Sequence, residues 1–449
     1  MTSTLHAGAR LDRLPISSFH RRILWLIGGG MFLDSFDIYL AGGVLGALVK
    51  SGWSSIPLNA AFLSATFAGM LIGAFSAGVL GDAKGRKFTY QFNLAIFGIA
   101  SFVGAFSPNM IFLIVARFFM GLGLGAEIVV GYGSIGEFIP PAVRGKWSAY
   151  LSLMTNSALF VSTFLGYLII PTIGWRVMFA IVGVGALVVW VIRKKMPESP
   201  RWLESKERFE EAEAILRVAE AESARGAPLP PVASSERMVT HKTSLIDLFR
   251  PRQLRRILVA IMVQIAINFV IYGFIVWVPT FLVKQGLGVS SSLGYTTLMS
   301  LGGPVGAIVG VFIADRLGRK NGLIIVSILA AIVGWLYGNS TTVEMATLLG
   351  FALFTLTYLM VTLGIATYTP ELFATENRMR ANGVASCAGR ITGILAPQLV
   401  VVLFAAGGVK QVLMVIVGVL LVMTAVLAAF GIETNRRSLE DIAPEPEAQ

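Results

Sequence analysis

The residues Asp82-Ala83-Lys84-Gly85-Arg86-Lys87 return 233 positions later as Asp315-Arg316-Leu317-Gly318-Arg319-Lys320, so both stretches read D-x-x-G-R-K. A second motif is repeated at almost the same distance. Glu137-Phe138-Ile139, with Arg144 seven residues after the Glu, returns 234 positions later as Glu371-Leu372-Phe373, with Arg378 seven residues after the Glu. Two unrelated motifs with one spacing indicate two parallel structural repeats in one chain.

The composition around these repeats indicates a membrane protein. Of the 449 residues, 55% are hydrophobic and only 14% are charged, with a mean hydropathy of +0.75. A water-soluble globule of this composition would expose too much apolar surface, and average soluble domains carry about 25% charged residues. The same values exclude a disordered chain, and a single cysteine, Cys387, excludes a disulfide framework.

The hydropathy predicts an all-α polytopic membrane protein, because a spanning helix needs roughly 20 mainly apolar residues. Twelve candidate helices form two pseudo-symmetric six-helix bundles. Their approximate ranges are 23–48, 58–80, 91–107, 109–136, 147–170, 175–193, 254–283, 293–314, 322–338, 343–369, 380–405 and 410–431. The expected domains are an N-terminus (1–22), a first bundle (23–193), a central loop with a surface helix (194–253), a second bundle (254–431) and a tail (432–449).

The basic residues predict the orientation of the chain. Thirty Lys and Arg lie on the side of the termini and the central loop, against four on the other side. The positive-inside rule therefore places both termini in the cytoplasm of a cell, and we expect a multi-pass protein of the bacterial inner membrane. The net charge of +11 is a topology signal rather than a nucleic-acid-binding signal. Met1 to Arg22 leads into a span too long for a cleavable signal peptide.

Further motifs carry a family resemblance that covers nearly the whole chain. Gly81 to Lys87 resembles the loop 2–3 signature of the major facilitator superfamily. Residues 197–203 (PESPRWL), 117–127 (RFFMGLGLGAE) and 389–397 (GRITGILAP) are similar to the sugar-porter and metabolite–proton symporter branch. The pair Asp34-x-x-Asp37 looks more like the aromatic-acid and niacin porters of that branch. The resemblance implies a secondary transporter that works by alternating access, with a midplane site lined by helices 1, 4, 7 and 10.

The repeated loops predict a gate at the cytoplasmic face. Their glycines allow a tight turn, and their arginines can pair with carboxylates of neighbouring helices. Such pairs could hold one face closed and separate when it opens, or they could be static positive charges at the membrane surface. The candidate gating residues are Asp82, Arg86, Glu137, Arg144, Asp315, Arg319, Glu371 and Arg378.

Buried acids are candidates for proton coupling, because an ionisable group at mid-membrane is costly and marks a functional site by default. Asp34 and Asp37 lie on one face of the first span, and Glu127 lies deep in the fourth. Asp34 is favoured slightly, with Asp37 placed nearer the rim of a cavity. The alternative is a permanent ion pair, for example between Arg390 and one of these acids.

The candidate substrate-binding residues lie in the second half of the chain and on two helices of the first. Arg390 can attract a carboxylate bidentately, which favours an organic monocarboxylate as cargo. Gln264, Asn268 and Tyr272 form a polar stripe on helix 7 that either positions a ligand or bonds to another helix. Arg117, near the outer end of the fourth span, is interpreted as a structural residue or as part of an outer gate. Aromatic rings that could flank a planar ligand are Tyr39, Tyr132, Trp277, Phe354 and Tyr358.

Other kinds of site are not expected. Gly121-x-Gly123-x-Gly125 lies inside an apolar span without a preceding strand, so it indicates close helix packing rather than dinucleotide binding. The sequence has no P-loop, and its three histidines lie in polar segments, so we expect neither ATP drive nor a metal site. No cofactor other than the proton gradient is expected.

The sequence therefore predicts a proton-coupled symporter of a small organic acid, such as nicotinate or a benzoate, and not an enzyme. A sugar or sugar-acid porter remains open, as does a uniporter or efflux antiporter of the same fold. A non-transporting receptor usually adds a large soluble domain, and the central loop here has only about 60 residues. The expected partners are the substrate, protons and the lipid bilayer, and the chain is expected to be a monomer that binds no nucleic acid.

Overall fold

The computed structural model describes residues 5–224, 228–232, 251–373 and 375–434, and these residues are almost entirely helical. Their contacts group the chain into two compact units. Unit 1 comprises Met1–Ile38, Ala65–Ala158 and Arg176–Val239. Unit 2 comprises Tyr39–Ser64, Leu159–Trp175 and Thr240–Gln449. The outer parts of three helices of the first half therefore belong to the second unit.

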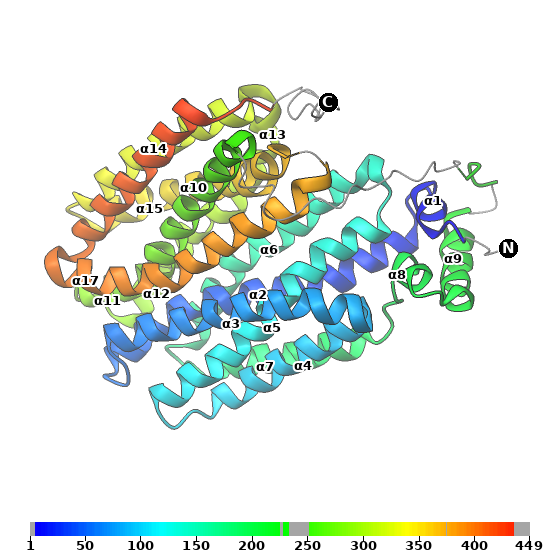
Figure 1. Cartoon of the computed structure of the whole chain (residues 1–449). Coiled ribbons are helices and arrows are strands. Elements are labelled where there is room, and N and C mark those ends of the chain that lie inside the picture. Colours follow the sequence, from blue (N-terminus) through cyan, green and yellow to red (C-terminus); the bar gives the residue numbers. More distant parts are fainter. Residues whose placement is uncertain (1–4, 225–227, 233–250, 374, 435–449) are drawn as a thin grey trace. The chain divides into compact units, whose positions relative to one another are not determined.

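The first half of the chain forms six long helices and three short ones (Figure 1). The long helices match the first six predicted spans. They are α2 (Ser18–Lys50), α3 (Ile56–Lys84), α4 (Arg86–Ala105), α5 (Met110–Phe138), α6 (Pro141–Ile169) and α7 (Arg176–Arg193). The short helices are α1 (Ala7–Asp12), α8 (Pro200–Ser205) and α9 (Phe209–Ala224), and α9 is the predicted surface helix.

The second half is more interrupted than the first. Its elements are α10 (Pro251–Gly273), η2 (Ile275–Trp277), α11 (Val278–Lys284), α12 (Val289–Ser300), α13 (Gly302–Leu317), α14 (Arg319–Gly338), α15 (Val343–Met360), the π-helical η3 (Val361–Tyr368), α16 (Thr369–Glu371) and α17 (Thr375–Phe430).

Ten helices among the described residues are long and apolar enough to cross a membrane, against twelve predicted spans. Two local features explain the difference. The eighth predicted span is divided into α12 and α13 at Leu301, so each piece is too short alone. The eleventh and twelfth spans are two helices that meet at Gly407 and Gly408, where the backbone leaves the helical conformation, and they carry the single label α17.

The sequence repeat extends into the packing of each unit. In unit 1, a Cβ added to Gly73 of α3 would overlap the carbonyl oxygen of Leu122 in α5. In unit 2, a Cβ added to Gly306 of α13 would overlap the carbonyl oxygen of Thr355 in α15. Both members of this contact are displaced by 233 positions, the spacing of the D-x-x-G-R-K motifs. Backbone therefore meets backbone at the same helix crossing in both units, which only glycine allows.

The repeated loops fold in the same way in both units. Gly85 and Gly318 have φ of 95° and 80°, a region that favours glycine, and each precedes a helix. Glu198 accepts hydrogen bonds from the backbone N–H of Arg86 at 2.9 Å, and Glu433 accepts from that of Arg319 at 2.8 Å. A carboxylate thus caps the positive end of α4 and of α14.

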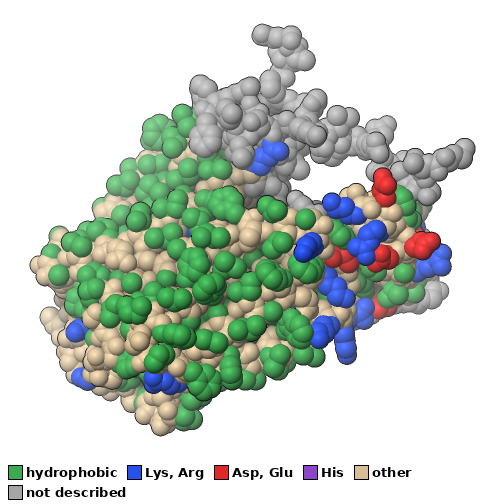
Figure 2. Space-filling model, turned by 60° about the horizontal axis from the view of Figure 1, so that its bottom comes forward, with side chains coloured by type: hydrophobic (Ala, Val, Ile, Leu, Met, Phe, Trp, Pro, Cys, Tyr) green, Lys and Arg blue, Asp and Glu red, His purple; other side chains and the backbone are tan. Residues whose placement is uncertain are grey.

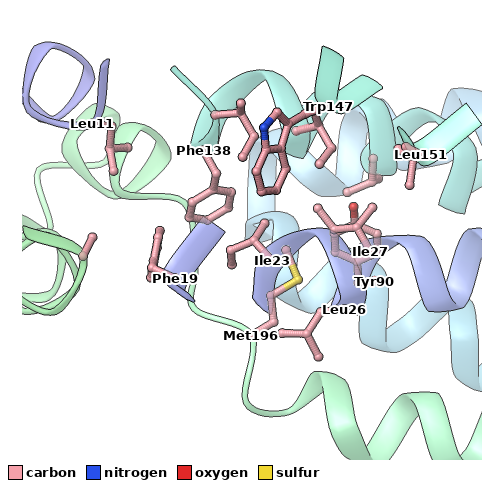
Figure 3. Packing of buried hydrophobic residues seen from close by; sticks show 14 of the residues in the cluster. Leu11, Phe19, Ile23, Leu26, Ile27, Tyr90, Phe138, Trp147, Leu151 and Met196 are labelled. Carbon is pink, nitrogen blue, oxygen red and sulfur yellow. The ribbon is translucent and has the colours of Figure 1, made fainter. Parts of the chain in front are cut away.

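One end of unit 1 is closed by an ionic and hydrophobic cap. Arg10 of α1 bonds Glu213 and Glu220 of α9, and the distance from Arg10 Nη2 to Glu220 is 2.8 Å. Beneath these pairs lies a buried cluster that includes Phe19, Phe138 and Trp147 (Figure 3). Figure 2 shows that most charged side chains of the visible face gather at one end, whereas the remainder is largely hydrophobic. Such a surface suits a lipid environment.

Candidate functional site

Unit 1 buries five charged side chains, and two of them form a closed ion pair. Arg117 of α5 is 0% exposed and pairs with the carboxylate of Asp37 in α2, which is also 0% exposed. The guanidinium also donates to the Asp37 carbonyl oxygen at 3.0 Å and to Thr66 Oγ1 at 2.9 Å. Arg117 is therefore held by α2 and α3 within the described structure, and its role as a structural or outer-gate partner stays a prediction. Asp37, expected nearer the rim of a cavity, is fully buried.

A second buried ion pair joins α5 to α7. Arg193 contacts Glu127, and both are about 1% exposed. Arg193 also donates to the carbonyl oxygens of Leu26 at 2.7 Å and Ile27 at 2.9 Å, and its guanidinium lies 4.6 Å from the centre of the Tyr90 ring. This arginine is held on every side by α2, α4 and α5. Glu127 and Asp37 thus pair with arginines of their own unit, and not with Arg390 as one interpretation of the sequence allowed.

Sequence reasoning does not find Arg193, because it directly precedes Lys194 and Lys195 and counts there as one more basic residue at the end of a span. One signal points to it indirectly. Gly30 of α2 leaves no room for a Cβ beside the Arg193 guanidinium and Glu127 Oε1. A glycine within the first span therefore marks the place where α2 passes the ion pair, although the sequence does not name its partner.

Asp34 stands apart from these pairs. It is 1% exposed, and its Oδ2 atom has no hydrogen-bond partner within the described part of the chain. Asp34 follows Gly30 by four residues on the same face of α2, and it interacts electrostatically with Glu127 and Arg193. Asp34, Glu127 and Arg193 thus form a cluster with two acids and one base. With both acids ionised the cluster carries one net negative charge, whereas the Asp37–Arg117 pair is neutral.

In unit 2, Arg390 of α17 is a partly buried guanidinium. The structure shows no ion pair or hydrogen bond for it among the described residues, and its electrostatic neighbours are Cys387 and Tyr272. The preceding residue, Gly389, allows close contact with α10, since a Cβ there would lie 2.7 Å from Asn268 Nδ2 and 3.0 Å from Gln264 Oε1. The backbone next to Arg390 therefore packs against two amides of α10.

The polar stripe of α10 is partly used within its own helix. Asn268 Nδ2 donates to the Gln264 carbonyl oxygen at 2.7 Å and to Gln264 Oε1 at 3.1 Å. Gln264 and Asn268 thus lie against Gly389, the residue before Arg390, and their role in binding substrate stays a prediction. Tyr272 is half-buried in the same helix and near Arg390.

The candidate aromatic residues divide into two groups. Tyr39 and Tyr358 of unit 2 meet edge to face, with ring centres 6.4 Å apart, and Tyr39 is half-buried. Trp277 is 1% exposed and stacks on Phe281, and Phe354 is 0% exposed and packs against Phe274. The latter two rings belong to the packed interior of unit 2.

The predicted gating pairs form within each unit. Glu137 Oε1 accepts from Arg86 Nη2 at 3.0 Å, and Glu371 Oε2 lies 3.3 Å from Arg319 Nε. Arg201, from the sequence 197–203, donates to the Glu137 carbonyl oxygen at 3.0 Å and to Asp12 at 2.6 Å. The motif pairs are therefore real contacts. Five predicted side chains lie outside the described residues: Asp82, Tyr132, Arg144, Asp315 and Arg378.

Two pseudo-symmetric sets of apolar helices with charges buried in their interior define a polytopic membrane transporter. Residues 29–445 match the family described as sugar (and other) transporter, and the chain belongs to this family. The expected major facilitator fold of twelve helices is confirmed, and the protein is a transporter and not an enzyme.

Relatives of known sequence extend over the whole chain. The inner membrane metabolite transport protein YdjE of Escherichia coli is 40% identical, covering 97% of this chain and 98% of its own. The niacin transporter NiaP of Acinetobacter baylyi is 34% identical, covering 97% and 99%. Among solved structures, the xylose transporter XylE of E. coli in a partially occluded inward-open conformation superposes with a TM-score of 0.76 at 18% identity, over 94% of this chain and 100% of the other. This last likeness is one of fold.

Proposed function

We propose that the protein is a proton-coupled symporter that carries a small organic acid, in particular an aromatic monocarboxylate such as nicotinate or a benzoate. The observation that carries the proposal is Arg390, a partly buried guanidinium without an ion-pair partner among the described residues. A guanidinium in a low-dielectric cavity binds a carboxylate through two parallel hydrogen bonds. The name of the NiaP relative, a niacin transporter, supports the same class of cargo.

The polar and aromatic surroundings of Arg390 suit a flat acid. The amides of Gln264 and Asn268 lie against Gly389 and offer neutral donors and acceptors beside the charge. Tyr39, Tyr272 and Tyr358 supply rings within the same unit. Aromatic pairs contribute about 0.5–1.5 kcal/mol beyond their area burial, which favours an aromatic acid over an aliphatic one.

Asp34 is the proposed coupling residue, and the charge of its cluster supports this choice. One proton neutralises the cluster of Asp34, Glu127 and Arg193, whereas protonation of Asp37 would leave Arg117 as an unpaired buried cation. Burial of an uncompensated charge is strongly unfavourable, so the proton should bind to the cluster. Co-transport of one proton with a monocarboxylate anion moves no net charge, so the expected drive is the pH difference, about 1.4 kcal/mol per pH unit.

The proposal includes the setting of the transporter. The protein lies in the bacterial inner membrane with both termini on the cytoplasmic side. It works as a monomer and uses the proton gradient, without a bound cofactor. The pairs Arg86–Glu137 and Arg319–Glu371 belong to the cytoplasmic ends of the helices and rearrange as the cargo site changes sides.

A transport panel in proteoliposomes tests the function. Radiolabelled nicotinate, benzoate, nicotinamide, a sugar acid and xylose are offered to the full-length protein with an imposed proton gradient. We expect accumulation of nicotinate or benzoate and none of nicotinamide, which lacks the carboxylate. Accumulation of xylose alone would refute the organic-acid proposal and support the sugar-porter alternative.

The variant Arg390→Gln tests the carboxylate anchor. Hydrogen bonds to charged groups contribute about 1.5–3 kcal/mol, so kcat/KM for the acid should fall by about 10- to 150-fold. Arg316→Gln is the matched control, because Arg316 is exposed on α13. Transport of the acid by Arg390→Gln at the wild-type rate would exclude Arg390 as the anchor.

A further inference from the structure

Several polar atoms in the interior of unit 1 have no hydrogen-bond partner among the described residues. Among them are Glu127 Oε2, the Tyr90 hydroxyl, Ser134 Oγ and Glu137 Oε2, whereas Glu127 Oε1 contacts Arg193. Buried polar groups are nearly always satisfied, so a set of unsatisfied ones calls for an explanation. Neither the carboxylate anchor nor the Asp37–Arg117 pair uses any of them.

These atoms belong to two packed helices and follow one another along them. Glu127, Ser134 and Glu137 lie on α5. Ser134 follows Glu127 by seven positions, and Glu137 follows it by ten. At 1.5 Å per residue the three positions span about 15 Å along the helix, and a separation of seven residues returns to the same face. Tyr90 projects from α4, which packs against α5. Figure 3 shows Tyr90 beside Ile27 of α2.

Tyr90 connects the two ends of this series. Its hydroxyl interacts electrostatically with Arg193, Glu127 and Glu137, and Ser134 lies next to it. Since the hydroxyls of Tyr90 and Ser134 have no direct hydrogen-bond partner of good geometry, a bridging water is the usual connection between such groups. Charged groups next to this series, within the described part of the chain, include Arg193 at Glu127, and Arg86 and Arg201 at Glu137.

The series ends at a cavity. Arg86, Glu137, Arg201 and Lys206 are among the residues that line an open space of about 400 Å³ at the polar end of unit 1. Glu137 keeps one oxygen on Arg86 and leaves Oε2 without a partner. A proton that reaches Glu137 therefore meets a polar cavity rather than lipid.

We infer that Tyr90, Ser134 and Glu137 form a proton exit route from the Asp34–Glu127 cluster to the cytoplasm, through the interior of unit 1 and apart from the carboxylate site at Arg390. The inference rests on the proposed function and on the predicted orientation. Glu127 takes the proton from Asp34 and passes it to a water. Each hydroxyl accepts one proton on its oxygen and releases its own, so it ends unchanged. Glu137 takes the last proton and releases it to the cavity.

The test separates proton release from substrate movement. Full-length protein in proteoliposomes is assayed in two ways with labelled nicotinate: uptake driven by a proton gradient, and counterflow at equal pH. A loaded symporter exchanges substrate without releasing its proton, so counterflow does not need the route. Tyr90→Phe keeps the ring over Arg193 and removes the hydroxyl, and Ser134→Ala removes the other hydroxyl. The controls are Tyr150→Phe and Ser157→Ala, which remove side-chain hydroxyls on α6.

We expect Tyr90→Phe and Ser134→Ala to slow proton-driven uptake at least tenfold while counterflow and the controls match wild type. Normal driven uptake by both variants, with Asp34→Asn still unable to accumulate substrate, would overturn the route and leave symport intact. Equal loss of counterflow and driven uptake would assign these residues a structural role and also overturn it. Wild-type protein that takes up nicotinate without moving protons would overturn both the route and the symport proposal.

Discussion

The two aspartates of α2 should respond oppositely to the same substitution. Asp37 neutralises Arg117 in a site that is 0% exposed, whereas Asp34 has no ion-pair partner of its own among the described residues. Removal of one partner of a buried ion pair costs about 3–5 kcal/mol, because the remaining charge is left uncompensated. Asp37→Asn keeps the backbone carbonyl and Thr66 as acceptors for Arg117, so we expect a loss near the lower limit, about 3 kcal/mol.

The corresponding change at Asp34 removes a charge from a cluster that is already net negative. Asp34→Asn should therefore leave stability unchanged or raise it. Unfolding entropies of about 2.1 cal/mol/K per residue correspond to roughly 0.9 kcal/mol/K for this chain, so 3 kcal/mol lowers the midpoint by about 3 °C. The measurement is thermal unfolding in detergent micelles, followed by the fluorescence of the 8 tryptophans.

A double variant supplies the control. Asp37→Asn combined with Arg117→Gln removes both charges, and we expect it to recover most of the stability lost by Asp37→Asn alone. The reasoning is refuted if Asp34→Asn is as destabilising as Asp37→Asn. It is also refuted if the stability lost by the double variant equals the sum of the losses of Asp37→Asn and Arg117→Gln.

Two further predictions concern packing and pH. Gly73→Ala should destabilise the protein by about 1–3 kcal/mol, since its Cβ meets the backbone of Leu122, whereas Gly29→Ala, with open space around it, should be neutral or stabilising; thermal unfolding distinguishes them. The Arg10 guanidinium holds the pKa of Glu220 below its usual range. The stability from this pair is present above the unfolded pKa of about 4.3 and is lost as pH falls through the lower folded value, so the contact of α1 with α9 should persist at pH 5 and weaken only below about pH 4; hydrogen–deuterium exchange of α1, corrected for its intrinsic pH dependence, measures this, and Arg10→Gln should remove the difference.

The sequence predicts the membrane class, the spans and the repeat because each of these depends on local composition or on spacing along the chain. Twenty apolar residues span a bilayer whatever their neighbours are. The paired D-x-x-G-R-K loops and their glutamates also form as expected, since Arg86 and Glu137 lie at ends of helices that a short connection keeps adjacent. The predicted spans are interrupted at Leu301, within the eighth span, whereas Gly407 and Gly408 separate the eleventh from the twelfth as predicted.

The partners of the buried charges depend on how helices distant in sequence rotate and approach one another, so only the tertiary structure identifies them. The sequence alone does not show which of Asp34 and Asp37 has an ion-pair partner, because both are aspartates and lie three positions apart on one helix. The structure places Arg117 against Asp37 and leaves Asp34 beside the Glu127–Arg193 pair. Hydropathy along the chain shows that a charge is costly in the membrane, whereas the arrangement in space decides which charge is compensated by a direct ion pair and which one is not.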